Sequence, residues 1–130
     1  MTRQTEPTTL SERQMEIMSI IWGRGKATVG EVWEEMSARR KVARNTILTL
    51  MTRLEEKGWL GHEEEGSAYR YFPRRRRETT LRGLVHQLVD TAFAGSADSL
   101  VMALIEGRGV SSDEAERIRA MIAQAEGTPT

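Results

Sequence analysis

Apolar positions at helical spacing mark two helices near the start of the chain. Residues 12–22 place isoleucine, methionine and tryptophan three and four positions apart until two glycines break the pattern. Residues 29–36 repeat this spacing over a shorter stretch. Ser11 is followed three residues later by glutamine and Thr28 by glutamate, which is the spacing of a capping box. The pattern therefore predicts two capped helices, each with one face packed in a core.

A third helix is predicted from Val42 to Lys57, and Gly58 can end it in the left-handed conformation that helix termini favour. Its apolar face consists of Ile47, Leu50, Met51 and Leu54. Asparagine can bond adenine, arginine can bond guanine, and a threonine methyl can pack on the thymine methyl in the major groove. The polar arc is therefore a candidate DNA-reading surface, with a merely solvated face as the alternative. Its candidate contacts are Arg44, Asn45, Thr46, Thr49, Thr52 and Arg53.

The next segment is predicted to be a β-hairpin, with strands at residues 59–63 and 68–73 around a four-residue turn. Three helices followed by a hairpin form a winged helix-turn-helix, in which the third helix enters the major groove and the hairpin, or wing, reaches the flanking backbone. Ser67 and Arg70 are the candidate phosphate contacts of the wing. The carboxylates of residues 63–65 would repel phosphate, so either they point away from DNA or the wing contributes little.

Three further amphipathic helices are predicted after residue 79, and they are too short to bury one another's apolar faces. A homodimer would share these faces across a two-fold axis and would set two reading heads to match a palindromic operator. The alternative is a monomer that folds these helices back onto the first helix. The candidate dimerisation residues are Leu84, Leu88, Leu100, Val101, Leu104, Ile105, Ile118, Met121 and Ile122.

The predicted fold class is therefore mainly α with a small β-hairpin. A winged-helix DNA-binding domain is expected at residues 9–73, a helical dimerisation segment at 74–125, and flexible tails at 1–8 and 126–130. The four arginines at 74–77 fit a phosphate-gripping strap and a solvated joint equally well.

Three motifs carry a family resemblance: IIWG at residues 20–23, NTILTLMTRL at 45–54, and YRY at 69–71. With them, nearly the whole chain resembles the penicillinase and methicillin-resistance repressors BlaI and MecI, which have the copper-responsive CopY repressors as relatives. The resemblance implies a winged-helix homodimer that represses transcription from an inverted repeat of TACA and TGTA half-sites. The base-reading residues that it implies are Thr46, Thr49 and Arg53.

Two positions in the third helix depart from the family pattern. Relatives often have serine or a similar capping residue where this chain has Ala43, and a basic residue where it has Asn45. Alanine supplies no side-chain oxygen to the helix start, which weakens the cap by about 1 kcal/mol. Asn45 leaves the operator preference open.

The resemblance also bears on how repression is relieved. In the β-lactam branch of the family, a membrane sensor protease system triggers cleavage of an Asn-Phe bond in the dimerisation segment. The matching bond here is Ala103–Leu104, so the change leaves proteolysis open as an input, although the helix would have to open locally first. Metal sensing of the CopY type needs a cysteine cluster, and the chain has no cysteine, so neither a metal nor another cofactor is expected.

Composition narrows the function class. The 130 residues carry no net charge, but the segment up to Glu78 has 15 Lys and Arg against 12 Asp and Glu, which weakly favours a DNA-facing N-terminal half. The polar start lacks the apolar stretch of a signal peptide, and no apolar run reaches membrane-spanning length, so a cytoplasmic protein without membrane insertion is expected. No catalytic motif is present, and His62 and His86 have only surface-type acidic neighbours, so no enzyme is predicted. The rival function is a winged-helix module that binds protein instead of DNA.

Overall fold

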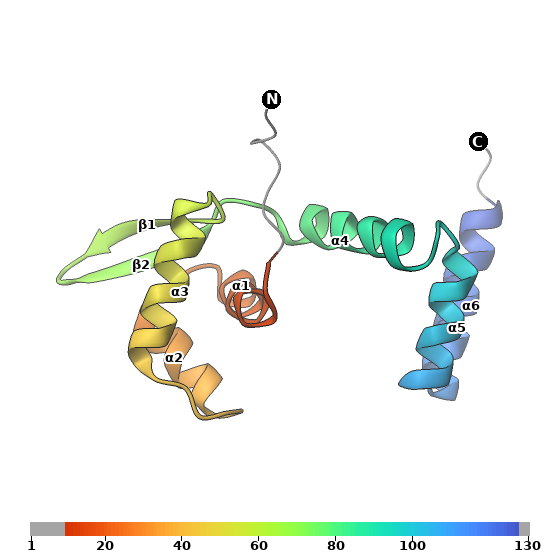
Figure 1. The fold of residues 1–130 in the computed structure, drawn as a ribbon, viewed down its shortest axis with the longest axis horizontal. Coiled ribbons are helices and arrows are strands. Elements are labelled where there is room, and N and C mark those ends of the chain that lie inside the picture. Colours follow the sequence, from red (N-terminus) through yellow and green to blue (C-terminus); the bar gives the residue numbers. More distant parts are fainter. Residues whose placement is uncertain (1–9, 128–130) are drawn as a thin grey trace. The chain divides into compact units, whose positions relative to one another are not determined.

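The computed structural model describes residues 10–127 and confirms a mainly α fold with one hairpin (Figure 1). The elements are α1 (Glu12–Arg24), α2 (Val29–Ser37), α3 (Arg44–Glu56), β1 (Leu60–Glu65), β2 (Ala68–Pro73), α4 (Arg77–Ala92), α5 (Ala97–Gly107) and α6 (Ser112–Gly127). The expected tail at residues 1–8 lies outside the described residues. Of the tail expected at 126–130, the first two residues end α6 and the last three lie outside.

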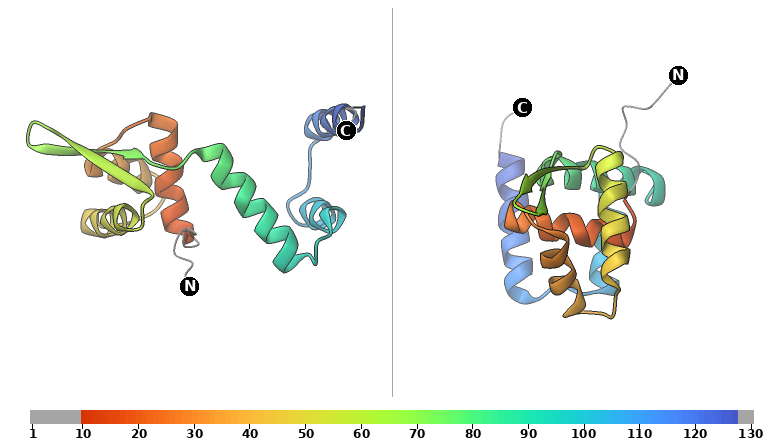
Figure 2. Two further views of the ribbon diagram at one scale, coloured as in Figure 1. Left: turned by 90° about the horizontal axis from the view of Figure 1, so that it is seen from above. Right: turned by 90° about the vertical axis from the view of Figure 1, so that its left-hand side faces the viewer.

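The chain divides inside α4 into an N-terminal unit that ends at Arg82 and a C-terminal unit that begins at Gly83. From sequence, the division was expected between residues 73 and 74, shortly before α4 begins. Contacts between elements are concentrated in the N-terminal unit, where α1, α2, α3 and the hairpin pack together (Figure 2).

The predicted capping boxes fix the starts of α1 and α2. The Ser11 hydroxyl accepts from the Gln14 amide at 3.1 Å, and the Gln14 side chain accepts from the Ser11 amide at 2.9 Å. Thr28 and Glu31 make the same reciprocal pair at 3.1 and 3.0 Å. These bonds satisfy amides at the helix start that have no partner within the helix.

The core of the N-terminal unit is formed by the apolar faces that the sequence pattern predicted. Ile47, Met51 and Leu54 of α3 are fully buried, whereas Leu50 is only partly buried. The remaining buried apolar residues are Ile17, Met18, Ile20, Ile21, Ala27, Val32, Met36, Trp59, Leu60 and Tyr71. This core holds α3 and the wing in a winged-helix arrangement, as predicted.

The hairpin differs from the prediction at its turn. Its strands pair antiparallel from Leu60 opposite Pro73 to Glu65 opposite Ala68, so the connection is only Gly66 and Ser67. The predicted four-residue turn is wrong because Gly66, with φ of 64°, supplies the positive φ that a tight two-residue turn needs at its first position.

The C-terminal unit has well-formed helix ends but no core of its own. The Ser96 and Ser111 hydroxyls accept from amides three residues ahead at 3.1 Å, which caps α5 and α6. No residue between 83 and 127 is buried, and none of α4, α5 and α6 packs extensively on another. Within the described residues no single helix is long and apolar enough to cross a membrane, whereas α4 and α5 pass that test only as a bent pair, by length and composition.

Candidate nucleic-acid interface

Helix α3 presents a polar face to solvent because its opposite face is buried in the core. It begins after Ala43, which has no side-chain hydrogen bond to the helix start, as predicted. It ends at Glu56, and Gly58, which follows the C-cap Lys57, has a φ of 88°, the left-handed conformation predicted for this position. All six predicted contacts on this helix are exposed: Arg44, Asn45, Thr46, Thr49, Thr52 and Arg53.

Two features of this face were not predicted from the sequence, the exposure of Leu48 and a hydrogen bond made by Thr52. Leu48 is 44% exposed although it lies in the same helix as the buried leucine at position 54. It follows Ile47 directly, so a rotation of about 100° turns it away from the core, and this offset was the available signal. The Thr52 hydroxyl donates to the Leu48 carbonyl at 2.8 Å, so its donor is used within the helix.

A groove of about 420 Å³ separates the N-terminal half of α3 from the wing and the start of α2. It brings Arg44 and Asn45 of α3 together with Ser67 of the wing. Its remaining lining residues are Thr28, Val29, Leu48, Ala68, Tyr69 and Tyr71. The predicted contacts at Thr46, Thr49, Thr52 and Arg53 do not line this groove.

One face of the wing packs toward α3. Tyr71 is buried and pairs with Ala27 through two backbone hydrogen bonds of 2.8 and 2.9 Å. His62 stacks on Tyr69 with ring centroids 4.2 Å apart, and its Nδ1 lies 2.6 Å from a carboxylate oxygen of Glu55 on α3. Together these contacts hold the wing against the N-terminal unit and α3.

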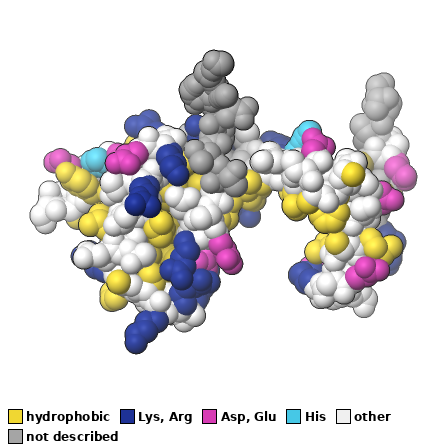
Figure 3. All heavy atoms as spheres, viewed as in Figure 1, with side chains coloured by type: hydrophobic (Ala, Val, Ile, Leu, Met, Phe, Trp, Pro, Cys, Tyr) yellow, Lys and Arg dark blue, Asp and Glu magenta, His cyan; other side chains and the backbone are white. Residues whose placement is uncertain are grey.

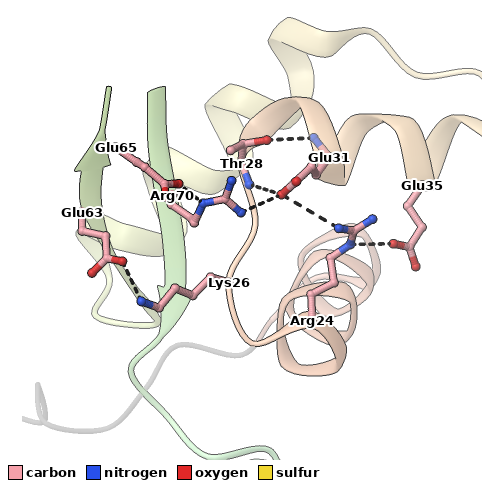
Figure 4. Close-up of polar contacts among 8 residues, drawn as sticks. All are labelled: Arg24, Lys26, Thr28, Glu31, Glu35, Glu63, Glu65 and Arg70. Atoms are coloured by element: carbon pink, nitrogen blue, oxygen red, sulfur yellow. Dashed lines mark hydrogen bonds and ion pairs between the residues drawn. The ribbon is translucent and has the colours of Figure 1, made fainter. Parts of the chain in front are cut away.

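The other face of the wing forms ion pairs with α2 and with the loop that precedes it (Figure 4). Lys26 lies 2.6 Å from a carboxylate oxygen of Glu63. The Arg70 guanidinium donates to Glu65 of the wing and, at 3.3 Å, to Glu31 of α2. Two of the three wing carboxylates are therefore already paired with cations, which weakens the repulsion that they would exert on phosphate.

The hydrogen bonds and ion pairs of this network shift the pKa values of Glu31 and Arg70. The pKa of Glu31 is lowered, first by the hydrogen bond from the Thr28 amide and then by the positive charges of Arg70 and Arg24. The pKa of Arg70 is raised, mainly by its hydrogen bond and charge interaction with Glu65. The charge of Arg70, a predicted phosphate contact, is thus compensated by protein carboxylates.

The arginine run at residues 74–77 is divided between packed and open side chains. The Arg75 guanidinium lies 5.0 Å from the Trp59 ring centroid, and the Arg75 carbonyl accepts from the Trp22 indole at 2.9 Å. Arg74 lies 5.5 Å from the Phe72 ring. Arg74, Arg76 and Arg77 are exposed. Of the four arginines, Arg75 therefore anchors the end of the wing to the core.

In the C-terminal unit, the predicted dimerisation residues are all at least partly exposed, and hydrophobic side chains are visible on its surface in Figure 3. Leu84 and Leu100 are partly covered, and the others are exposed: Leu88, Val101, Leu104, Ile105, Ile118, Met121 and Ile122. The Ala103–Leu104 bond lies in the middle of α5, with both residues exposed.

Known proteins resemble the chain over nearly all of its length. A family model described as penicillinase repressor matches residues 10–124. The transcriptional regulator BlaI of Mycobacterium tuberculosis is 31% identical over 121 residues, which is 92% of this chain and 86% of that protein. The methicillin resistance regulatory protein MecI of Mammaliicoccus sciuri is 27% identical over 110 residues, covering 85% of this chain and 89% of that one.

A solved structure matches about half of the chain. It is the monomeric form of Bacillus licheniformis BlaI in complex with the blaP half-operator, with a TM-score of 0.50 and 30% identity over 56% of this chain and 89% of that one. The sequence motifs, the winged-helix fold and these comparisons agree, and the chain belongs to the penicillinase repressor family.

Proposed function

We propose that this protein is a homodimeric transcriptional repressor that places α3 in the major groove of an inverted-repeat operator. The observation that carries the proposal is the outward face of α3. Between Arg44 and Leu54 the helix has no acidic residue, so nothing on its first three turns repels phosphate. Its exposed asparagine, threonine and arginine side chains match the donors and acceptors of base edges.

The comparison with BlaI supports this placement. That protein was solved as a monomer on a half-operator, and the match covers 56% of this chain. One reading head per half-site is the arrangement that a two-fold dimer would repeat on both halves of an inverted repeat. A repressor of this kind acts in the cytoplasm, where it meets the DNA.

Within the proposed complex the predicted residues take different roles. Thr46, Thr49 and Arg53 read bases, as the family resemblance implies, and Asn45 adds an adenine-type contact near the helix start. Arg44 and Ser67 line the groove beside the reading face and contact the backbone. Arg70 holds the wing in place through its carboxylate partners.

The absence of buried residues from 83 to 127 supports the homodimer. Apolar side chains such as Ile105 and Met121, which are 50% and 65% exposed, lose contact with water when a second copy covers them. An isologous interface uses the same apolar faces twice, so one set of helices supplies both sides.

If proteolysis relieves repression, it would do so by disrupting the proposed dimer interface. A cut between Ala103 and Leu104 would divide α5 and separate α6 from the rest of the chain. Since the bond lies within a helix, α5 has to unwind locally before a protease can bind it in extended form. A sensor protease system is therefore the proposed partner for induction.

The test is a titration of the full-length protein against a TACA/TGTA inverted repeat and a scrambled duplex at two salt concentrations. We expect preference for the repeat, a steep loss of affinity with salt, and loss of the preference in Thr49→Ala and Arg53→Ala. Arg13→Ala is the matched control, because it removes an exposed arginine from α1 and leaves the reading face intact.

Equal binding to both duplexes would be followed by selection from a random duplex pool. Enrichment of another inverted repeat would mean that Asn45 and Ala43 have changed the operator. Enrichment of no sequence would overturn the proposal and favour a protein-binding winged helix.

A further inference from the structure

Leu48 is an apolar side chain in the outward, otherwise polar part of α3. The core takes Ile47, Met51 and Leu54, all fully buried, while Leu48 keeps 44% of its surface in contact with solvent. A single exposed leucine is ordinary on a protein surface. Its position is what matters, because it lies beside Asn45 and the groove that leads to the wing.

Thr52 makes Leu48 part of a larger apolar patch. Residues four apart on a helix are neighbours on its surface, with Cβ atoms about 5–6 Å apart. The Thr52 hydroxyl donates to the Leu48 carbonyl at 2.8 Å, which directs its polar end to the helix backbone. The only hydrogen of the hydroxyl is thereby used within the helix, so Thr52 offers a partner its methyl and an oxygen that can only accept.

The major groove offers one apolar group on its base edges, the C5 methyl of thymine. We propose that Leu48, together with the Thr52 methyl, selects thymine at one position of each half-site by packing on this methyl. The inference rests on the proposed function, since it needs α3 in the major groove. It assigns specificity to a residue whose side chain can make no hydrogen bond.

The test removes the C5 methyl of thymine from the DNA and the Leu48 side chain from the protein, first separately and then together. In the duplex that the protein prefers, each thymine of one half-site is replaced in turn by deoxyuridine, which lacks only the C5 methyl. The wild-type protein is expected to lose about fourfold in affinity at one position, the value for one buried methyl-sized group. Leu48→Ala is expected to bind thymine and deoxyuridine equally at that position.

Two further variants make the assignment specific. Leu48→Gln keeps the length and helix propensity of the side chain but removes its apolar end, so it should lose the methyl preference as Leu48→Ala does. Arg13→Ala removes an exposed side chain of α1, outside the proposed reading face, and should keep the preference at the Leu48 position. Because Leu48 is exposed, thermal unfolding of its variants should match that of the wild type.

The outcomes separate the inference from the function on which it rests. If the wild type prefers its operator but Leu48→Ala remains as sensitive to every deoxyuridine as the wild type, the function stands and the inference is overturned. The same holds if no deoxyuridine weakens wild-type binding. If the wild type prefers no sequence at all, both fall.

Discussion

The N-terminal and C-terminal units are built from similar helices and use them differently. Each unit has helices with apolar stripes and serine or threonine caps, and these helices, α1, α2, α5 and α6, have 9 to 16 residues. In the N-terminal unit these stripes meet and bury thirteen apolar residues, while from residue 83 to 127 none is buried. Local signals thus determine where helices form, and only a facing surface turns an apolar stripe into a core.

The difference has an energetic consequence. Helices of 11 to 16 residues, such as α5 and α6, are marginal in water unless an apolar face is packed. The N-terminal unit provides that packing within one chain, so its stability should not depend on protein concentration. The C-terminal unit is proposed to obtain it from a second copy, so its stability should rise with concentration.

The largest effect is expected when a charge is placed on the proposed interface. Ile105→Glu would bring two carboxylates into one dimer and leave them without partners. We expect sedimentation to show a monomer and operator affinity to fall by a factor on the order of 100 to 10,000, because the two reading heads are no longer linked.

Ala120→Glu is the control for that variant, since it adds the same charge on the side of α6 away from Ile118 and Ile122. It should remain dimeric. A dimeric Ile105→Glu protein with unchanged operator affinity would show that α5 does not form the interface.

The next effect concerns the core of the N-terminal unit. Leu54→Ala removes a fully buried side chain and should lower the free energy of unfolding by about 2–5 kcal/mol. Leu48→Ala makes the same chemical change on the exposed side of α3 and should cost less than about 1 kcal/mol.

Chemical denaturation at two protein concentrations checks this prediction. The loss in Leu54→Ala should be the same at both concentrations, because this core lies within one chain. A loss that shrinks at the higher concentration would mean that association stabilises the N-terminal unit as well.

Local signals were sufficient to predict most of the fold. Ser11 and Thr28 predicted the starts of α1 and α2 because a capping box needs only residues three apart. Ile47 and Leu54 predicted the buried face of α3 because helical geometry fixes which residues share a side. The same geometry predicted the polar arc, whose six candidate residues are all exposed in the structure.

Features that depend on contacts across the chain could not be predicted. The partners of Arg70 lie on the same hairpin and on α2, so nothing near it in sequence indicates that Glu31 compensates its charge. After the end of α4, Ala94 takes a positive φ of 52°, as the glycine that follows it does with 82°. The Val89 carbonyl accepts from the Gly95 amide at 2.9 Å, a helix-ending bond that places Ala94 in the left-handed position.

A smaller, stabilising effect is expected at the uncapped start of α3. Ala43→Ser supplies the side-chain oxygen that the first turn lacks, and the free energy of unfolding should rise by about 1 kcal/mol. Ala38→Ser, at the C-terminal end of α2, adds the same hydroxyl where no helix amide needs an acceptor and should leave stability unchanged. Equal denaturation midpoints for Ala43→Ser and the wild type would show that water already satisfies these amides.

The smallest effect is expected in the ion-pair network of the N-terminal unit. Glu31→Gln keeps a side-chain acceptor for the Thr28 amide, as Gln14 provides in α1, but removes the charge that faces Arg70 and Arg24. The pKa of Glu31 is lowered by the Thr28 hydrogen bond and then by these arginines, so its charge stabilises the fold above its ordinary pKa of 4.5. This contribution is lost as the pH falls through the lowered folded pKa.

The wild type should therefore exceed Glu31→Gln in stability by a few tenths of a kcal/mol at pH 7, the range of partly exposed ion pairs. Denaturation from pH 7 to pH 3 should show this difference disappear at low pH, and high salt should reduce it at pH 7. Glu34→Gln, an exposed position on the same helix, should show neither trend. A difference that stays constant at every pH and salt concentration would mean that the charge of Glu31 contributes nothing to stability, and that the wing is held to α2 without help from charge.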